Sequence, residues 1–236
     1  MTDLLIVKNI SREGPGLLNQ ILIDNNVSFD IVDLDAGDML PNPTAYKAVV
    51  VFGGPDSAND TTDKMTQELE LIKAAIGLGL SYLGICLGMQ TLVKAASGKV
   101  VKADIKEVGF VSPSSSLFTV ELTDIGKKDP LLAGLVGPLN VFHLHGETVE
   151  LTNDMTLLAT GKYCKNQIVK VADRAYGIQS HFELTSEMLH EWALNDPDLI
   201  PLGNTQLLET FKAIQSTYNH TGETLFRNFL NIANLI

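Results

Sequence analysis

The chain has 236 residues, 45% of them hydrophobic and 19% charged, which is enough apolar material for the core of one large globular domain. Its net charge of −11 argues against nucleic acid or an anionic membrane as the main partner. No apolar run approaches the roughly 18 residues of a membrane-spanning helix. Two cysteines, Cys86 and Cys164, make no disulfide framework, and no basic leader precedes the first apolar run, so we expect a cytoplasmic protein.

Residues 1–98 alternate between apolar runs of strand length and segments with helical spacing. We predict strands at 4–7, 27–34, 48–52 and 80–85, and helices at 17–22, 65–76 and 87–96. This alternation is typical of an α/β protein whose mostly parallel central sheet is covered by helices on both faces. Ligands of such sheets bind at the carboxyl ends of the strands.

The pattern changes near residue 99, where short apolar runs are separated by turn residues. Runs at 100–103, 117–122, 141–144, 155–159 and 167–172 predict a smaller antiparallel or mixed β section on the same core, followed by a strand at 176–182. Helices are expected near 185–193, 205–216 and 223–235. We therefore expect a single domain over 1–236, with a core at 1–185 and a helical extension at 186–236. The apolar faces of that extension are expected to pack on the sheet, with a homodimer or partner surface as the alternative.

Cys86 lies between a predicted strand and a predicted helix, which is the layout of a nucleophile elbow. Gly84 and Gly88 flank it, and their missing β-carbons let the strand and the helix approach each other closely. The turn places the sulfur beside the first amides of a helix, a position that favours the thiolate form. The alternative is a small buried core residue, which is the usual role of a lone cysteine.

A cysteine nucleophile needs a base and a group that orients the base. His181 lies near a strand end, and strand alternation places Glu183 on the same face, where its carboxylate can accept the second imidazole N–H. A His-x-Glu pattern alone is also common among ordinary surface residues.

Acyl transfer also requires backbone amides that stabilise an oxyanion. The amide of Leu87 at the helix start is one candidate donor, and Gly53-Gly54 supplies a second because glycine lets the backbone approach a substrate. A zinc site built from His143 and His145 is the alternative to a triad, with Glu147 as the one further candidate ligand. Because the set is incomplete, we expect neither a metal nor a cofactor.

Three separated motifs resemble the class I glutamine amidotransferases. They are Val51-Phe52-Gly53-Gly54-Pro55, Gly84-Ile85-Cys86-Leu87-Gly88-Met89-Gln90 and Gly177-Ile178-Gln179-Ser180-His181-Phe182-Glu183. Lys106-Glu107-Val108-Gly109-Phe110 and His145-Gly146-Glu147 also look like family segments. The resemblance covers about residues 1–185 and looks closest to the amidotransferase domain of GMP synthetase, so it implies a flavodoxin-like sheet.

The resemblance implies a reaction and assigns roles to residues. Cys86 would attack the side-chain amide of L-glutamine, His181 would act as base and then protonate ammonia, and Glu183 would orient His181. Amides of Leu87 and of Gly53 or Gly54 would hold the oxyanion, and a γ-glutamyl thioester would be hydrolysed to glutamate. The side chain of Gln90 and the segment His145-Gly146-Glu147 would contact the bound glutamine. In the family, the ammonia passes to an acceptor on a synthetase domain or subunit.

Two departures from the family pattern stand out. The family usually has Gln-Phe-His-Pro-Glu around the base, whereas this chain has Ser180 and Phe182 in place of the aromatic residue and the proline. We expect the lost proline to leave the turn less rigid and to affect the rate rather than the role. No synthetase domain or phosphate-binding glycine loop follows, so the acceptor is expected to be absent or on another chain.

Two other functions remain open at this stage. One is a stand-alone hydrolase or transferase of another γ-glutamyl compound, which would use the same thioester chemistry. The other is a catalytically silent regulatory relative or a redox sensor based on Cys86, against which the intact Cys-His-Glu set argues.

Overall fold

Five parallel strands form one half of a nine-stranded sheet in the computed structural model, which describes residues 2–236. In sheet order they are β2 (Phe29–Asp33), β1 (Leu4–Lys8), β3 (Ala48–Val51), β4 (Ser81–Ile85) and β11 (Ala175–Ile178). Because β3, β4 and β11 are parallel neighbours, their carboxyl ends meet at one edge of the sheet. The segments that contain Gly53, Cys86 and His181 therefore begin side by side.

The antiparallel section continues the same sheet beyond β11. It consists of β10 (Ile168–Ala172), β9 (Thr156–Gly161), β6 (Thr119–Leu122) and β7 (Leu139–Asn140). A separate two-stranded antiparallel sheet is formed by β5 (Lys99–Gly109) and β8 (His143–Glu150). The predicted α/β fold with a parallel sheet and an antiparallel section is confirmed, and four of the antiparallel strands, β10, β9, β6 and β7, belong to the same sheet as the parallel ones.

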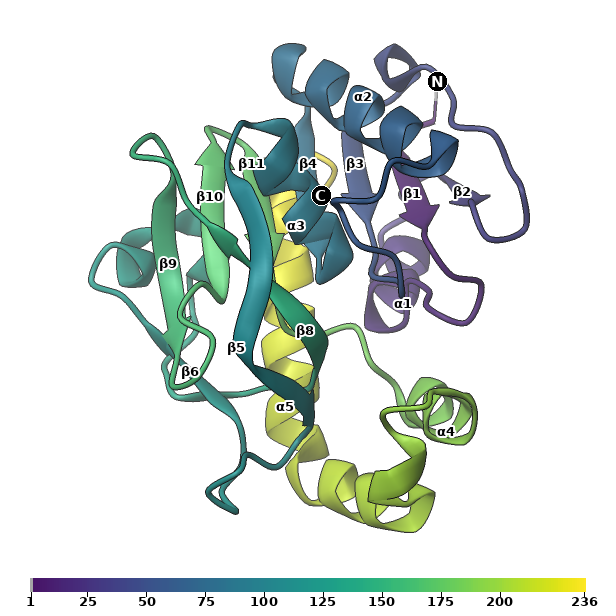
Figure 1. Cartoon of the computed structure of the whole chain (residues 1–236). Coiled ribbons are helices and arrows are strands. Elements are labelled where there is room, and N and C mark those ends of the chain that lie inside the picture. Colours follow the sequence, from purple (N-terminus) through teal and green to yellow (C-terminus); the bar gives the residue numbers. More distant parts are fainter. Residues whose placement is uncertain (1) are drawn as a thin grey trace.

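Helices cover both faces of the sheet (Figure 1). Helices α1 (Leu17–Asp24) and α5 (Asn204–Ile232) pack on one face, and α2 (Asp63–Gly77) and α3 (Leu87–Ala95) pack on the other. Within β1, Leu4 and Ile6 point to the α1–α5 side while Leu5 and Val7 point to the α2–α3 side. All four side chains are fully buried, which explains why the strand is apolar throughout rather than alternating.

The C-terminal extension differs from its sequence-based prediction. Helix α4 (Ser186–Asn195) matches the first expected helix, but the second and third are one continuous helix, α5. The prediction of a break between residues 216 and 223 was wrong, and Gly222 lies inside the helix where another segment packs closely against it. A Cβ atom on Gly222 would lie 2.3 Å from the backbone carbonyl oxygen of Phe182.

Four short 3₁₀ turns complete the described elements: Pro43–Ala45, Gly126–Lys128, Pro130–Leu132 and Ile200–Leu202. Over residues 2–236, we find no helix with both the length and the apolar character needed to cross a membrane.

Candidate active site

Cys86 occupies a strained turn between β4 and α3. Its φ of 53° and ψ of −108° lie in a region that residues with a β-carbon rarely adopt, and such strain concentrates at functional sites. A Cβ on Gly84 would lie 2.1 Å from the carbonyl oxygen of Gly88, and a Cβ on Gly88 would lie 2.1 Å from that of Val51. The two glycines are therefore required by close backbone packing, as the elbow pattern predicted.

His181 and Glu183 form a short, buried hydrogen bond. Nδ1 of His181 lies 2.6 Å from Oε1 of Glu183, and both side chains are at most 1% exposed. A carboxylate accepts, so Nδ1 carries the proton and Nε2 is the nitrogen left for proton transfer. The predicted strand at 176–182 is too long, since β11 ends at Ile178. The pair therefore meets in the loop after β11 and not through strand alternation.

The charges around His181 favour its protonated form. Burial alone would lower the pKa of the imidazole, but the Glu183 carboxylate and the Cys86 sulfur outweigh burial and raise that pKa well above its usual value. The position of a Cβ on Gly53 shows how close the groups lie. That point is 3.2 Å from Cε1 of His181 and 3.3 Å from Cβ of Cys86. The imidazole is thus placed beside the thiol with a basicity suited to accepting its proton.

The departures from the family motif have a structural counterpart. The backbone N–H of Phe182 donates a 2.9 Å hydrogen bond to Oε2 of Glu183, which a proline at this position could not do. The Phe182 ring is 1% exposed and packs against Tyr218, with ring centroids 6.0 Å apart. The turn that lacks the family's proline is therefore held by a hydrogen bond and by ring packing.

The C-terminal helices contact the loop that carries the base. The hydroxyl of Tyr218 in α5 donates a 2.6 Å hydrogen bond to the carbonyl oxygen of His181. The Trp192 ring in α4 lies edge-on to the imidazole, with centroids 5.2 Å apart. Sequence reasoning assigned neither residue to the site, because helical spacing explains both as core positions.

The candidate oxyanion donors surround the nucleophile. Gly53 and Gly54 follow β3, and Leu87 is the first residue of α3. Within residues 2–236, the amide N–H groups of these three residues donate to no protein acceptor. Free amides beside a nucleophile are the arrangement that stabilises the oxyanion of a tetrahedral intermediate.

A pocket of about 800 Å³ opens onto Cys86. It is lined by most of the residues that the sequence nominated: Gly54, Cys86, Leu87, Gln90, His145, Gly146 and Glu147. His181 and Glu183 lie behind this lining, fully buried. The carboxamide nitrogen of Gln90 donates to the carbonyl oxygen of Glu147 at 3.1 Å and to Oε1 of Gln179 at 3.3 Å, so Gln90 ties the pocket wall to the loop before His181.

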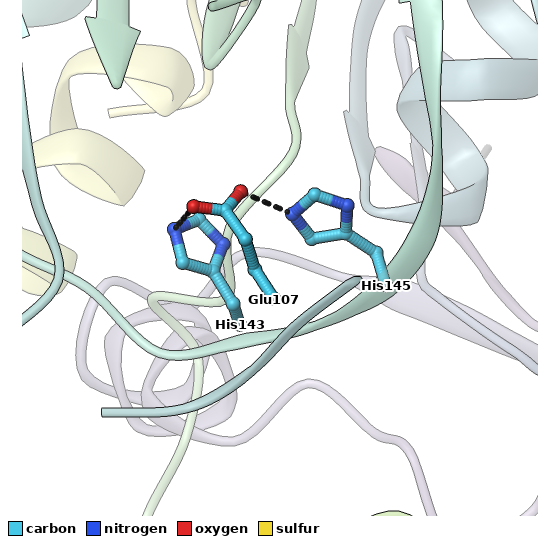
Figure 2. A group of neighbouring side chains, drawn as sticks. All are labelled: Glu107, His143 and His145. Atoms are coloured by element: carbon cyan, nitrogen blue, oxygen red, sulfur yellow. Dashed lines mark ion pairs between the residues drawn. The ribbon is translucent and has the colours of Figure 1, made fainter. Parts of the chain in front are cut away.

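His143 and His145 gain a neighbour that sequence reasoning had not considered as a ligand. Glu107 on β5 pairs in register with His145 on β8, and Figure 2 shows its carboxylate between the two imidazoles. Oε2 lies 3.1 Å from Nε2 of His145, and Oε1 lies 3.9 Å from Nε2 of His143. The three side chains are buried and offer one donor atom each within 4.8 Å of one another, which are the donor types that zinc prefers.

The other ring nitrogen of His145 contacts the backbone. Nδ1 of His145 lies 3.0 Å from the carbonyl oxygen of Glu147, which only accepts, so Nδ1 carries a hydrogen. Burial lowers the pKa of His143 well below its usual value and keeps that imidazole neutral. The absence of a metal stays a prediction. The bond from Nδ1 of His145 to the carbonyl oxygen of Glu147 holds the segment His145-Gly146-Glu147 in place.

Comparison with known proteins identifies the family. The family model "Glutamine amidotransferase class-I" matches residues 16–196, a range that contains every site residue that the sequence nominated. The chain belongs to the class I glutamine amidotransferases. The resemblance drawn from the three motifs is thereby confirmed.

Two relatives place the chain within this family. It is 35% identical over 158 residues to YfeJ, a glutamine amidotransferase-like protein of Salmonella typhimurium, over 64% of this chain and 63% of YfeJ. It is 31% identical to the GMP synthase of a Marinomonas species, over 67% of this chain and 28% of that enzyme. The aligned region is therefore less than two thirds of YfeJ and under a third of the GMP synthase.

Two solved structures support the fold. A glutamine amidotransferase from Methylobacillus flagellatus has a TM-score of 0.86 at 24% identity, covering 98% of this chain and 95% of its own. A glutamine amidotransferase from Thermotoga maritima has a TM-score of 0.84 at 24% identity, covering 98% and 99%. The coverage of 98% extends into the C-terminal helices. The second half of α5 packs on the sheet as expected, whereas α4 and the first half of α5 pack in a separate cluster around Phe110 and Phe142.

Proposed function

We propose that this protein hydrolyses the side-chain amide of L-glutamine, with Cys86 as nucleophile, His181 as base and Glu183 as orienting carboxylate. The observation that carries the proposal is the buried 2.6 Å contact between His181 and Glu183, with the imidazole beside a cysteine held in a nucleophile elbow. Family membership supports the reaction class. One domain over residues 1–236 carries the activity, and its helices after residue 185 brace the base.

The reaction proceeds in two stages. His181 takes the proton of Cys86, the sulfur attacks the amide carbon, and amides of Leu87 and of Gly53 or Gly54 stabilise the oxyanion. The C–N bond then breaks as His181 returns the proton to the leaving nitrogen. This releases ammonia and leaves a γ-glutamyl thioester on Cys86. Water activated by His181 hydrolyses the thioester to glutamate.

The ammonia is delivered to an acceptor on another chain in this proposal, as a synthetase subunit would provide. Both cysteines are unpaired, which suits a reducing cytoplasm. The size of the pocket, about 800 Å³, favours one second candidate: hydrolysis or transfer of a larger γ-glutamyl compound by the same thioester chemistry.

A panel of γ-glutamyl amides tests both candidates. Glutamine turned over faster than every substituted amide supports the proposal, whereas a substituted amide with the higher kcat/KM supports the second candidate. Failure of the wild-type protein to release product from any donor, alone or with cell extract, would leave the silent regulatory role. Cys86→Ala is the control for activity from a contaminant.

A further inference from the structure

Glu13 is a buried carboxyl group in the candidate active site to which no described residue donates a hydrogen bond. It lies in the loop between β1 and α1, is 4% exposed, and lines the same pocket as Cys86. Its Oε2 is fully buried without a partner, and within residues 2–236 its side chain accepts no hydrogen bond. A buried carboxyl without a donor is costly for the fold and calls for an explanation such as a ligand.

The neighbours of Glu13 place it on the His181 side of the nucleophile. The point where Gly53 would carry a Cβ lies 2.4 Å from Oε2 of Glu13, 3.2 Å from Cε1 of His181 and 3.3 Å from Cβ of Cys86. Glu13, the imidazole and the cysteine thus converge around the α-carbon of Gly53. Cε1 is bonded to Nε2, the nitrogen that would protonate the leaving group in the proposed reaction.

Among residues 2–236, the two cationic groups that lower the pKa of Glu13, Arg12 and His181, are already paired with other carboxylates. Arg12 pairs with Asp196 at 2.8 Å, and the imidazole of His181 is bonded to Glu183. Burial is the main cause that raises the pKa of Glu13 to about 7. Glu183 and Asp196 raise it further, against His181 and Arg12, which lower it. We therefore expect a hydrogen-bond donor of the ligand to satisfy this carboxyl.

We propose that Glu13 recognises the leaving group, by accepting hydrogen bonds from the N–H of the scissile amide and of the departing ammonia or amine. This inference rests on the proposed function and narrows its substrate class to acyl donors whose leaving atom carries hydrogen, that is, amides. In acylation the Sγ–C bond forms, the C–N bond breaks and the proton from His181 goes to nitrogen. Glu13 holds that nitrogen in place and exchanges no proton with it. The α-ammonium group of glutamine is the competing hydrogen-bond donor for Glu13.

Two acyl donors separate these partners. L-Glutamine and the γ-methyl ester of L-glutamate share the α-ammonium and form the same Cys86 thioester, but the ester oxygen carries no hydrogen. For each donor, kcat/KM reports acylation alone. We expect Glu13→Ala to lower kcat/KM for glutamine about 30-fold or more. The fold-loss of kcat/KM for the ester should be at least ten times smaller than the fold-loss for glutamine. Glu13→Gln, which keeps an acceptor oxygen, should fall between wild type and Glu13→Ala.

Glu68 offers a matched control. It is an equally buried glutamate on α2, burial raises its pKa to about 7 as well, and it does not line the pocket. Glu68→Gln should change kcat/KM for glutamine and for the ester by the same factor. A glutamine-like diazo ketone has no leaving N–H, so it should still label Cys86 in Glu13→Ala, which shows that the variant is folded and binds the γ-glutamyl group.

The outcomes are distinct. Equal losses for amide and ester would overturn the inference and assign Glu13 to the α-ammonium or to structure, and no loss for glutamine would also overturn it. Loss of diazo ketone labelling in both Glu13 variants would mean that Glu13 shapes the pocket and does not bind the leaving group. If the wild-type protein turns over neither donor, the proposed function fails, and this inference fails with it.

Discussion

The hydroxyl of Tyr218 in the last helix donates a 2.6 Å hydrogen bond to the carbonyl oxygen of His181, the candidate base. One turn further along the same helix, Gly222 allows the backbone of Phe182 to lie against it. The C-terminal helix thus supports the backbone of the loop that carries His181 and Glu183. This support has consequences that single substitutions can measure.

Tyr218→Phe should reduce kcat and leave KM nearly unchanged. The substitution removes one buried hydrogen bond, worth about 1 kcal/mol, and leaves the His181 carbonyl without its donor, so we expect a loss of roughly threefold to tenfold. Steady-state kinetics with glutamine measure both constants. Tyr163→Phe is the matched control, because that hydroxyl bonds to Ser114 outside the pocket. An unchanged kcat would show that α5 does not position the base.

Phe182→Pro restores the family's residue and should nevertheless impair this protein. Proline removes the N–H that donates to Glu183 and the ring that packs on Tyr218, so we expect lower kcat and a lower Tm. Hydrogen bonds to charged groups contribute about 1.5–3 kcal/mol. Phe182→Leu, which keeps the N–H, should retain most of kcat. Higher activity in the proline variant would instead support the idea that the missing proline costs rate.

The candidate triad predicts a ranking of variants. His181→Ala removes the proton acceptor and should lower kcat/KM more than Glu183→Gln, which leaves a base that is only misoriented. Rates of glutamate release, measured with each variant at equal folded concentration, give the ranking. The reverse order would identify the carboxylate as the base itself.

Glu68 gives a prediction for stability against pH. Burial raises its pKa from the usual 4.5 to about 7, so the folded state favours the protonated form. The stability that this proton supplies is fully present below pH 4.5 and is lost as the pH rises through about 7. Wild type and Glu68→Gln should therefore have similar free energies of unfolding near pH 4.5. Above pH 8, Glu68→Gln should be more stable than wild type by on the order of 3 kcal/mol. Urea unfolding at both pH values measures the difference, and an equal difference at both would contradict the pKa assignment.

The elbow and the fold could be predicted because their signals are local in the sequence. The glycines around Cys86 indicate where the strand and the helix pack closely together. The alternation of predicted strands and helices over the first 98 residues indicates a parallel sheet. The strand that was expected to carry His181 was predicted too long, because the residues after Ile178 stay buried although they have left the parallel ladder. The two helices expected near 205–216 and 223–235 are one helix, in which Gly222 admits the neighbouring backbone of Phe182.

Residues that act across long sequence distances could not be predicted. Glu107 reaches His145 through strand pairing, Tyr218 reaches His181 through helix packing, and Glu13 reaches the pocket through the meeting of β1 and β3 at the sheet edge. In none of these three contacts do the two residues lie at a sequence spacing that a helix or a strand would fix. Each depends on the tertiary arrangement that the hydrophobic pattern specifies only collectively.

Covalent labelling with a glutamine-like diazo ketone tests the central claim most directly, since it needs an activated Cys86 and glutamine recognition but no ammonia acceptor. Intact mass and peptide mapping should show one adduct on Cys86, blocked by excess glutamine and absent in Cys86→Ala. Cys164 should stay unlabelled, because burial raises the pKa of its thiol to about 11. If Cys86 reacts with generic thiol reagents but gives no such adduct, or gives one that glutamine does not block, the protein is not a glutamine-hydrolysing enzyme.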